Sequence, residues 1–311
     1  MSGAPGRAER LVPWLVFAGL AAAPFIGFGE GHALTLLARA MIFGMAAVAL
    51  MLLVGGAGLV SLGHAAMLGM GAYAVVVLDH AGIVEAWIVF PAGILAGAVF
   101  ALVTGAVAIR TSGVHFIMIT LAFGQMAFFT TSSLAIYGGD DGYTLFGRTE
   151  VLGARWLEDR LVFHFVCLGL LAGCWALVEA LLGSRFGRVL RATRDNETRA
   201  RALGFEPWPY RLVAYVIAGA IGGLAGVLLA NATEFVAPAY LAWQRSGDLL
   251  FMVILGGLAG PHGALVGALA FVLVEEWLSH LWQHWRLIFG PLLILCVFFL
   301  RGGIVGLLRR G

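Results

Sequence analysis

Long apolar runs separated by short polar stretches dominate the chain. Within a run, polar and apolar positions do not alternate; Ala40 to Val54, for example, reads AMIFGMAAVALMLLV. A helix needs about 20 apolar residues to cross a bilayer core of about 30 Å, whereas the strands of a membrane barrel alternate in polarity. The pattern therefore predicts an all-α bundle of about ten membrane helices, at roughly residues 11–28, 33–54, 64–79, 86–109, 114–137, 161–183, 211–231, 246–258, 264–279 and 287–300.

Charged residues divide the connections between these runs into two classes. Arginine-rich short loops stay on the cytoplasmic side of a membrane. The arginine-rich segments are the N-terminus, the junction at Arg110, the loop 184–210 and the C-terminal tail. An even number of predicted helices separates each of these segments from the next, so all four lie on one side of the membrane. We therefore expect residues 1–311 to form a single transmembrane domain. Both termini and the loop 184–210 would be cytoplasmic, and the acidic loop 138–160 would lie on the outer side.

The composition agrees with a membrane protein and narrows its function. Hydrophobic residues make up 61% of the chain and charged residues 12%, with a mean hydropathy of +0.96. Soluble globular proteins are only about 45–50% apolar. All 19 basic residues are arginine, whereas a nucleotide-binding P-loop needs a lysine that reaches the β- and γ-phosphates. If ATP drives this protein, we expect another subunit to bind it.

Patterns typical of enzymes, metal sites and proton relays are sparse. Only His280 and His284 have the i, i+4 spacing of a helical metal site, beside Glu275 and Glu276. No HExxH sequence supports a metal there, and the neighbouring tryptophans favour an aromatic belt at the membrane surface. The carboxylates of the apolar runs fall near predicted helix ends, where they form no mid-membrane relay. We expect no metal site, no cofactor and no enzymatic activity in this chain.

Glycines recur at four-residue spacing in several runs. Small residues one turn apart let membrane helices approach each other closely. We expect most of these pairs to pack helices within the chain, and some to be available for a subunit interface. The pairs are Gly93/Gly97, Gly169/Gly173, Gly219/Gly223, Gly222/Gly226, Gly256/Gly260 and Gly263/Gly267.

Two glycine-rich segments interrupt the helical pattern. They are GGAGLVSLGHAAMLGMGAY, from Gly55 to Tyr73, and GGLAGPHGALVGALAF, from Gly256 to Phe271. Helices broken by glycine and proline can turn backbone groups toward a cavity in the membrane, and ordinary turns between helices are the alternative interpretation. The candidate pathway residues come from these segments and, by side-chain type, from the run 114–137: Ser61, Gly63, His64, Thr120, Gln125, Gly256, Gly257 and His262.

The segment 184–205 concentrates arginine and predicts two short helices. Ser184 can cap the first helix and Asp195 the second, and Gly204 can supply the left-handed residue of a Schellman stop. The second helix, of about eight residues, is too short to be stable alone. The candidate docking residues are Arg194, Asp195, Asn196, Glu197, Arg199, Arg201, Ala202, Leu203 and Gly204.

Two interpretations of this basic segment remain open from the residues. In the first, the arginines rest on anionic membrane lipid. In the second, the segment docks on a soluble partner, with arginines meeting acidic groups at the rim of a groove. The apolar residues that would enter the groove are Ala200, Ala202, Leu203 and Phe205.

Five segments together resemble a known family. They are GRVLRATRDNETRARALGFEPWPYRLVAYVIAGAIGGLAGVLLA, GLVSLGHAAMLGMGAYAV, RTSGVHFIMITLAFGQMAFF, YGGDDGYTLFG and LLFMVILGGLAGPHGALVGALAF. As a set they are similar to segments of inner-membrane permeases of branched-chain amino-acid ABC importers, the LivM type. The match runs in order from about residue 40 to about residue 308. The related urea and short-chain amide permeases share most of these motifs.

The resemblance implies a type II-like importer fold in the bacterial inner membrane. It also implies partners: a second homologous permease, two ATPase subunits that bind ATP and magnesium, and a periplasmic binding protein; no nucleic acid is expected. Residues 194–204 would be the coupling helix that an ATPase groove receives. The periplasmic loop with Gly139, Asp140, Asp141 and Gly142 can contact the binding protein, although Gly-Asp turns explain it equally well.

The expected function is that of a permease subunit for branched-chain or other small amino acids. The chain departs from the family pattern at Gly56-Ala57-Gly58, where a polar stretch is common, and at His115, where tyrosine is usual. Both departures bear on substrate preference and leave urea or short-chain amides as alternatives. An ion-coupled secondary transporter or a channel that works alone is the alternative of a different class.

Overall fold

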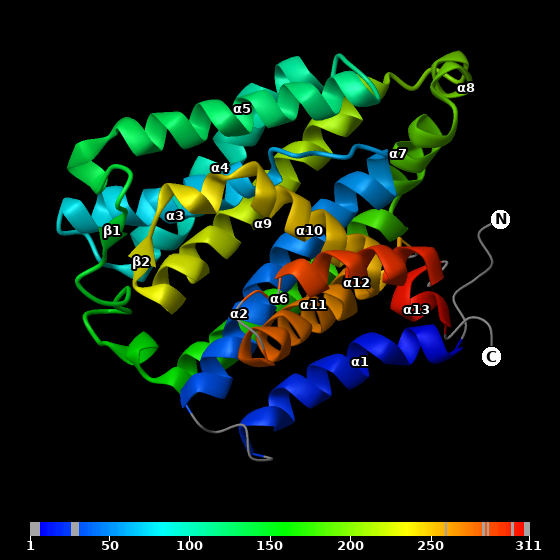
Figure 1. The fold of residues 1–311 in the computed structure, drawn as a ribbon. Helices are drawn as coiled ribbons and strands as arrows, with labels where there is room; N and C mark the ends of the chain where they lie inside the picture. The colour runs from blue at the N-terminus through cyan, green and yellow to red at the C-terminus, as the bar shows by residue number, and fades with distance from the viewer. Residues whose placement is uncertain are drawn as a thin grey trace.

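Helices make up most of the described chain (Figure 1). The structure is a computed structural model that describes residues 7–25, 31–258, 260–281, 284, 286–299 and 302–307. Two short strands, β1 (Tyr143–Thr144) and β2 (Phe235–Val236), pair antiparallel. The helices are α1 (Arg7–Ala22), α2 (Gly31–Met51), α3 (His64–His80), α4 (Ala86–Ala108), α5 (Val114–Ser133), α6 (Arg160–Gly183), α7 (Arg185–Asp195), α8 (Glu197–Ala202), α9 (Pro207–Thr233), α10 (Trp243–Gly256), α11 (Pro261–Leu281), α12 (Arg286–Phe299) and α13 (Gly303–Leu307).

The predicted all-α fold is confirmed, and a helix lies at each of the predicted positions. Among the described residues, six helices are long and apolar enough to cross a membrane, which shows a multi-pass membrane protein. The expectation of about ten crossings and the cytoplasmic placement of both ends stay predictions. The C-terminal arginines and two of the tryptophans near His280 lie outside the described residues. The six spans are Gly31–Ala57, Ala86–Ala108, Val114–Ser133, Arg160–Gly183, Pro207–Thr233 and Pro261–Leu281.

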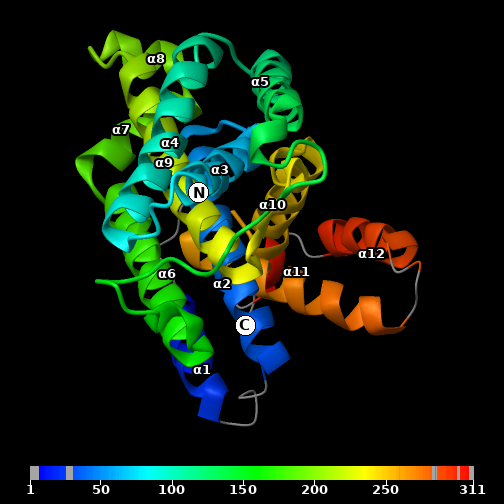
Figure 2. The ribbon, with the colours of Figure 1, turned by 90° about the vertical axis from the view of Figure 1, so that its left-hand side faces the viewer.

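Two helices, α2 and α9, form the centre of the bundle. Within the most apolar stretch of each span, the buried share of residues is 89% for α2 and 72% for α9. The corresponding share in the other four spans is 22–39%. Helices α3 and α4 pack on α9, while α6, α10 and α11 surround α2 (Figure 2). The core is therefore two helix clusters that meet along the α2–α9 contact.

Glycines allow the closest of these helix contacts. A Cβ atom on Gly97 of α4 would lie closer than 3.0 Å to Gly219 and Gly223 of α9, and one on Gly223 would meet Gly93 in the same way. Dispersion between backbones at such short range replaces the hydrophobic driving force that lipid removes. The prediction that these glycine pairs pack helices within the chain is confirmed for α4 and α9.

The pair Gly169/Gly173 does not follow the prediction of intrachain packing. A Cβ atom on either residue would meet no other atom within 4 Å. Both glycines therefore lie on a side of α6 that no other described helix contacts closely.

This difference gives a matched test of the packing. Gly223→Ala should lower the free energy of unfolding by about 1–3 kcal/mol, because the added methyl group overlaps the α4 backbone. Gly169→Ala adds the same group to a helix in open space and should be neutral or slightly stabilising. The measurement is the thermal unfolding midpoint of the purified chain in detergent. Equal midpoints for the two variants would contradict the close α4–α9 contact.

Candidate functional site

A non-helical segment interrupts the path of the chain between α2 and α3. Helix α2 continues beyond Met51 as a π-helical turn, Leu52–Ala57, and α3 begins only at His64. Figure 1 shows the intervening residues as an extended stretch beside the helices. Leu59, Ser61 and Gly63 of this stretch are buried. Buried non-helical backbone in a membrane protein must find its hydrogen-bond partners within the protein.

Hydroxyl groups from two other helices supply such partners. Thr120 Oγ1 of α5 accepts a hydrogen bond from the backbone N–H of Leu62 at 3.3 Å. Ser246 Oγ of α10 accepts one from the N–H of Ala65, in the first turn of α3, at 2.9 Å. Both hydroxyl side chains are buried. The start of α3 is thus fixed by neighbours that are distant in sequence.

Further polar groups gather at the same place. Ser61 Oγ accepts a hydrogen bond from the N–H of Gly63 at 3.3 Å and lies 3.5 Å from the hydroxyl of Tyr215 in α9. His64 Nε2 donates to the carbonyl of Ala46 in α2 at 3.1 Å. Ser61 and His64 are both fully buried. Residues 58–65 are named the broken segment. Together with these partners they form a polar cluster inside an apolar bundle.

The structure brings together four of the predicted pathway residues: Ser61, Gly63, His64 and Thr120. Gly63 is required there, because a Cβ atom would lie closer than 3.0 Å to the carbonyl oxygen of Thr120. Sequence reasoning missed Tyr215 and Ser246. Their signal is weak, since a single hydroxyl in an apolar run (Tyr215) or at the polar start of a helix (Ser246) is common.

The remaining pathway residues belong to α5, α10 and α11 and the residue after α10. Gly256 is the last residue of α10, Gly257 follows it in the turn to α11 with a φ of +110°, and His262 is the second residue of α11. A Cβ atom on Gly257 would clash with Gly302, so the turn packs closely against the start of α13. Gln125 is half-buried on α5 and bonds to none of the described residues. The second glycine-rich segment fits the interpretation as a tight turn.

The arginine-rich segment forms two short helices, as predicted. Ser184 Oγ accepts a hydrogen bond from the N–H of Gly187 and caps α7. Gly204 has a φ of +86°, and its N–H donates to Arg201 while that of Phe205 donates to Ala200. These two bonds are the pattern of a Schellman stop. The predicted end of the second helix is confirmed.

The predicted start of the second helix is wrong by one residue. Asp195 is the last residue of α7, and Asn196 caps α8 by accepting a hydrogen bond from the N–H of Arg199 at 2.8 Å. The side chain of Asp195 instead forms an ion pair with Arg194 at 2.9 Å. Helix α8 therefore has six residues rather than the expected eight or so. Asparagine and aspartate are comparable as caps, so a shift of one position keeps the same kind of cap.

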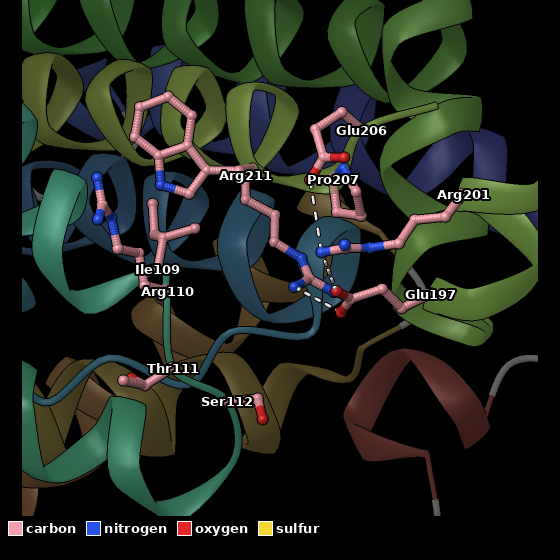
Figure 3. Close-up of a pocket in the computed structure, with 10 residues that line it drawn as sticks. Ile109, Arg110, Thr111, Ser112, Glu197, Arg201, Glu206, Pro207 and Arg211 are labelled. Atoms are coloured by element: carbon pink, nitrogen blue, oxygen red, sulfur yellow. Dashed lines mark hydrogen bonds and ion pairs between the residues drawn. The ribbon is translucent and has the colours of Figure 1, made fainter. Parts of the chain in front are cut away.

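Ion pairs hold this short helix against the bundle (Figure 3). Glu197 lies 3.0 Å from Arg201, within α8, and 3.0 Å from Arg211 of α9. Arg201 also pairs with Glu206 at 3.4 Å. The Arg211 side chain is only 12% exposed and also donates to the carbonyl of Thr193 at 3.2 Å. These contacts supply the tertiary support that six helical residues need.

A cleft of about 420 Å³ lies beside these ion pairs (Figure 3). One wall is the connection between α4 and α5, and the other is formed by α8 and the start of α9. Its charged groups are Arg110, Glu197, Arg201, Glu206 and Arg211.

Arg194, one of the predicted docking residues, is partly exposed but also contacts the bundle. Its guanidinium donates to the carbonyl of Gly55, at the π-helical end of α2. Leu190 of the same helix is buried and approaches Gly56 so closely that a Cβ there would lie 3.1 Å away. Helix α7 therefore rests on the end of α2, where the broken segment begins.

The outward surface of α8 is narrower than predicted. Ala200 is only 2% exposed and belongs to the protein's own packing, so it is not available to a partner groove. Leu203 is 69% exposed and Phe205 39%. Arg199 and Ala202 are exposed beside them. This set, Arg199, Ala202, Leu203 and Phe205, is named the docking tip.

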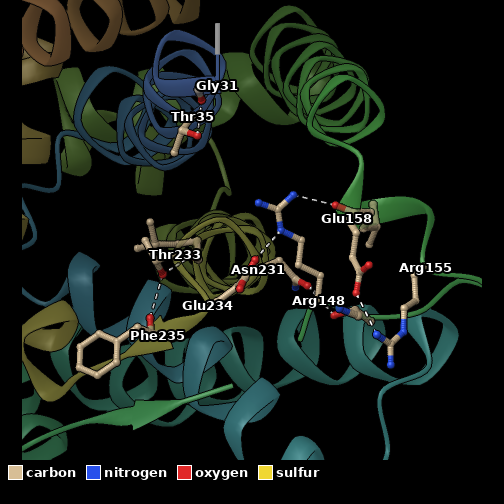
Figure 4. Close-up of polar contacts among 12 residues, drawn as sticks. Gly31, Thr35, Arg148, Arg155, Glu158, Asn231, Thr233, Glu234 and Phe235 are labelled. Carbon is tan, nitrogen blue, oxygen red and sulfur yellow. Dashed lines mark hydrogen bonds and ion pairs between the residues drawn. The ribbon is translucent and has the colours of Figure 1, made fainter. Parts of the chain in front are cut away.

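The loop 138–160 lies at the opposite end of the bundle from α8 (Figure 1). Figure 4 shows how it is fastened to the end of α9. Arg148 pairs with Glu234 at 3.1 Å, and both the N–H and the hydroxyl of Thr149 donate to Asn231 Oδ1 at 2.8 Å. Asp140 and Asp141 are exposed.

Glycine geometry accounts for the shape of this turn. Gly139 has a φ of +54° and Gly142 a φ of +87°. These are left-handed conformations that glycine adopts without steric cost. The turn interpretation of the Gly139–Gly142 stretch is thus supported, and a contact with a binding protein stays a prediction.

Loss of the Ser246 hydroxyl should destabilise the broken segment. Ser246→Ala leaves the buried N–H of Ala65 without its acceptor, which costs about 1–3 kcal/mol. The measurement is again the thermal unfolding midpoint in detergent. Ser133→Ala, at the exposed end of α5, removes a hydroxyl that bonds only to its own helix and should change stability by less than about 0.5 kcal/mol. The assignment fails if the two variants unfold alike.

Loss of the Asn196 cap should loosen α8 selectively. Asn196→Ala should cost about 1 kcal/mol of helix stability, which corresponds to about fivefold faster hydrogen exchange at the amides of residues 199–203. The measurement is hydrogen–deuterium exchange by mass spectrometry. Thr198→Ala changes an exposed residue of the same helix that makes no cap contact, and it serves as the matched control. Unchanged exchange in Asn196→Ala would show that the cap contributes nothing.

The sequence matches a protein family and several curated relatives. Residues 32–298 match the family described as branched-chain amino acid transport system / permease component. The chain is 26% identical over 256 residues to the high-affinity branched-chain amino acid transport system permease protein LivM of Salmonella typhimurium, covering 75% of this chain and 60% of that protein. It is 28% identical over 230 residues to the probable LivM of Methanocaldococcus jannaschii, covering 68% of this chain and 65% of that protein.

Sugar permeases are also among the relatives. The chain is 30% identical over 139 residues to the ribose import permease protein RbsC of Bacillus subtilis, covering 44% of this chain and 40% of that protein. No solved structure is significantly similar to the chain. The matched region spans about 60% of the length of the Salmonella relative. Because the family match covers most of the described bundle, including the broken segment and α8, this chain belongs to the branched-chain amino acid transport system / permease component family.

Proposed function

We propose that this chain is a transmembrane permease subunit of an ATP-driven ABC importer in the bacterial inner membrane. It forms the translocation pathway with a second homologous permease. Two separate ATPase subunits drive it, and a periplasmic binding protein delivers the substrate. The family membership supports the permease role, and the absence of lysine from the sequence agrees with ATP binding on other subunits.

The observation that carries the proposal is the docking tip on α8. Leu203, at the C-terminal end of α8, is 69% exposed, and the ion pair between Glu197 and Arg211 ties this helix to α9. An exposed leucine on an otherwise charged, pre-ordered helix is suited to enter an apolar pocket of a partner, since little conformational entropy is lost on binding. The arginine at position 199 can then meet acidic groups at the edge of that pocket.

Contacts of α7, the helix that precedes α8, connect the docking tip to the broken segment. Helix α7 rests on the π-helical end of α2 through Leu190 and Arg194. A Cβ atom on Gly58 would also lie closer than 3.0 Å to the Arg194 side chain. A movement of α7 and α8 driven by ATPase closure would therefore displace the start of the broken segment. Rigid elements in direct contact are the physical basis of such coupling.

The broken segment is the candidate element of the pathway. The buried hydroxyl groups that bond to it would exchange their present hydrogen bonds for bonds to a small polar solute when the segment opens, as interrupted helices do in transporters. The substrate class we propose is a branched-chain or other small amino acid, and urea or short-chain amides are the alternative. The two LivM relatives, which match 68–75% of the chain, support amino acids, and the L-arabinose permease relative, which matches 67% of it, makes a sugar the competing class to test.

The docking assignment can be tested with one exposed leucine. Leu203→Asp should reduce co-purification of the ATPase subunits at least tenfold, because the carboxylate cannot be desolvated in an apolar pocket. The permease itself should remain folded, since Leu203 makes no core contact. The matched control is Leu152→Asp, which changes a leucine that is 79% exposed in the loop at the opposite end. Normal co-purification of the ATPases with Leu203→Asp would overturn the docking assignment.

Reconstitution separates this function from a transporter that works alone. Proteoliposomes holding the purified chain should show no flux of amino acid, with or without an ion gradient. Flux should require the second permease, the binding protein, the ATPases and ATP together. Gradient-driven uptake by the chain alone would favour the ion-coupled alternative, and passive equilibration would favour a channel.

A further inference from the structure

A cluster of two histidines and one glutamate joins the first turn of α2 to the last part of α11. His32 Nε2 lies 3.0 Å from Glu276 Oε1, and His280 Nε2 lies 3.2 Å from the same oxygen. The three ligand atoms all lie within 4.8 Å of one another. The cluster is at the end of the bundle that carries β1 and β2, because Gly31 lies beside Arg160, which follows the loop 138–160.

The geometry of these atoms fits a divalent metal ion. Zinc binds histidine nitrogen and carboxylate oxygen at about 2.0–2.2 Å, so neighbouring ligand atoms of a tetrahedral site are about 3.4 Å apart. The two Nε2–Oε1 distances of 3.0 and 3.2 Å are close to that separation. Small side-chain rotations would let all three atoms face one ion. Two histidines and one glutamate are also a ligand set that zinc uses in proteins, with the fourth position left to water.

Position and charge also favour a cation here. Glu276 and His280 are one turn apart on the same face of α11, so a single helix presents both ligands. The two histidine side chains are 74% and 70% exposed, which gives an ion free access from the aqueous side. The nearby Arg39 does not oppose a cation strongly, because it is paired with Glu275 at 3.4 Å.

We propose that His32, Glu276 and His280 form a binding site for zinc or a similar transition-metal ion, which clips the start of α2 to the end of α11. This inference replaces the sequence-based expectation of no metal site. The sequence pointed to the pair His280 and His284, whereas the third ligand, His32, is 244 positions away from Glu276. The site does not depend on the transported substrate. It acts on α2, the most buried helix of the bundle.

Direct metal binding tests the site. The full-length chain is purified in detergent without a polyhistidine tag, stripped with a chelator and then dialysed against zinc. We expect one zinc per chain by elemental analysis, and cobalt in place of zinc should give the visible absorption bands of tetrahedral coordination. His32→Ala, Glu276→Gln and His280→Ala should each weaken binding at least tenfold. A rise in the thermal unfolding midpoint on adding zinc should occur in the unchanged chain and be lost in these variants.

Two control variants separate this site from adventitious binding. His115→Ala removes an exposed histidine at the start of α5, and His284→Ala removes the partner that the sequence spacing suggested. Both should keep one zinc per chain. Because the ligand histidines are exposed, the variants without metal should unfold at the same temperature as the unchanged chain without metal. If His32→Ala unfolds at a lower temperature, His32→Gln is used in its place. The proposal is overturned if the unchanged chain binds no stoichiometric zinc, or if His32→Ala and His115→Ala bind it equally.

Discussion

The need to satisfy buried backbone groups inside a membrane protein shapes this molecule most strongly at the broken segment. No water is available in the bilayer core, so every N–H and C=O there needs a partner in the protein. Between α2 and α3 the chain leaves helical geometry while still buried, and side chains of α5 and α10 supply the missing acceptors. The polar cluster around Ser61 and His64 therefore satisfies a structural requirement of the fold.

Close packing of glycine-rich helices gives this cluster a rigid frame. Helix α9 approaches α3 and α4 so closely that Cβ atoms cannot fit at several contact points. Tight contacts of this kind transmit displacement because packed interiors have few voids. The broken segment sits where the α3–α4–α9 cluster meets α2, which in turn carries α7 at its π-helical end. One continuous set of contacts thus runs from the exposed tip of α8 to the interior.

The two ends of the bundle use charge in different ways. At the α8 end, carboxylates and arginines pair with each other and leave a leucine exposed, which is an arrangement suited to a protein partner. At the other end, Arg148, Thr149 and Asn231 tie the loop down on α9, while two histidines converge on a single glutamate oxygen. Ion pairs at an exposed surface contribute little to stability individually, so their role here is mainly to fix position.

The sequence by itself determined the helical class, the approximate positions of the longer helices and the two short helices of the arginine-rich segment with their Ser184 cap and Gly204 stop. These features follow from local rules: hydrophobic length, capping chemistry and the conformational freedom of glycine. Only the tertiary structure decided which groups meet. It paired Arg194 with the end of α2, buried Ala200, and brought His32 to Glu276 and His280. The reason is that hydrogen bonds and ion pairs between distant segments depend on how whole helices pack, and no periodicity within one segment records the neighbour that it will face.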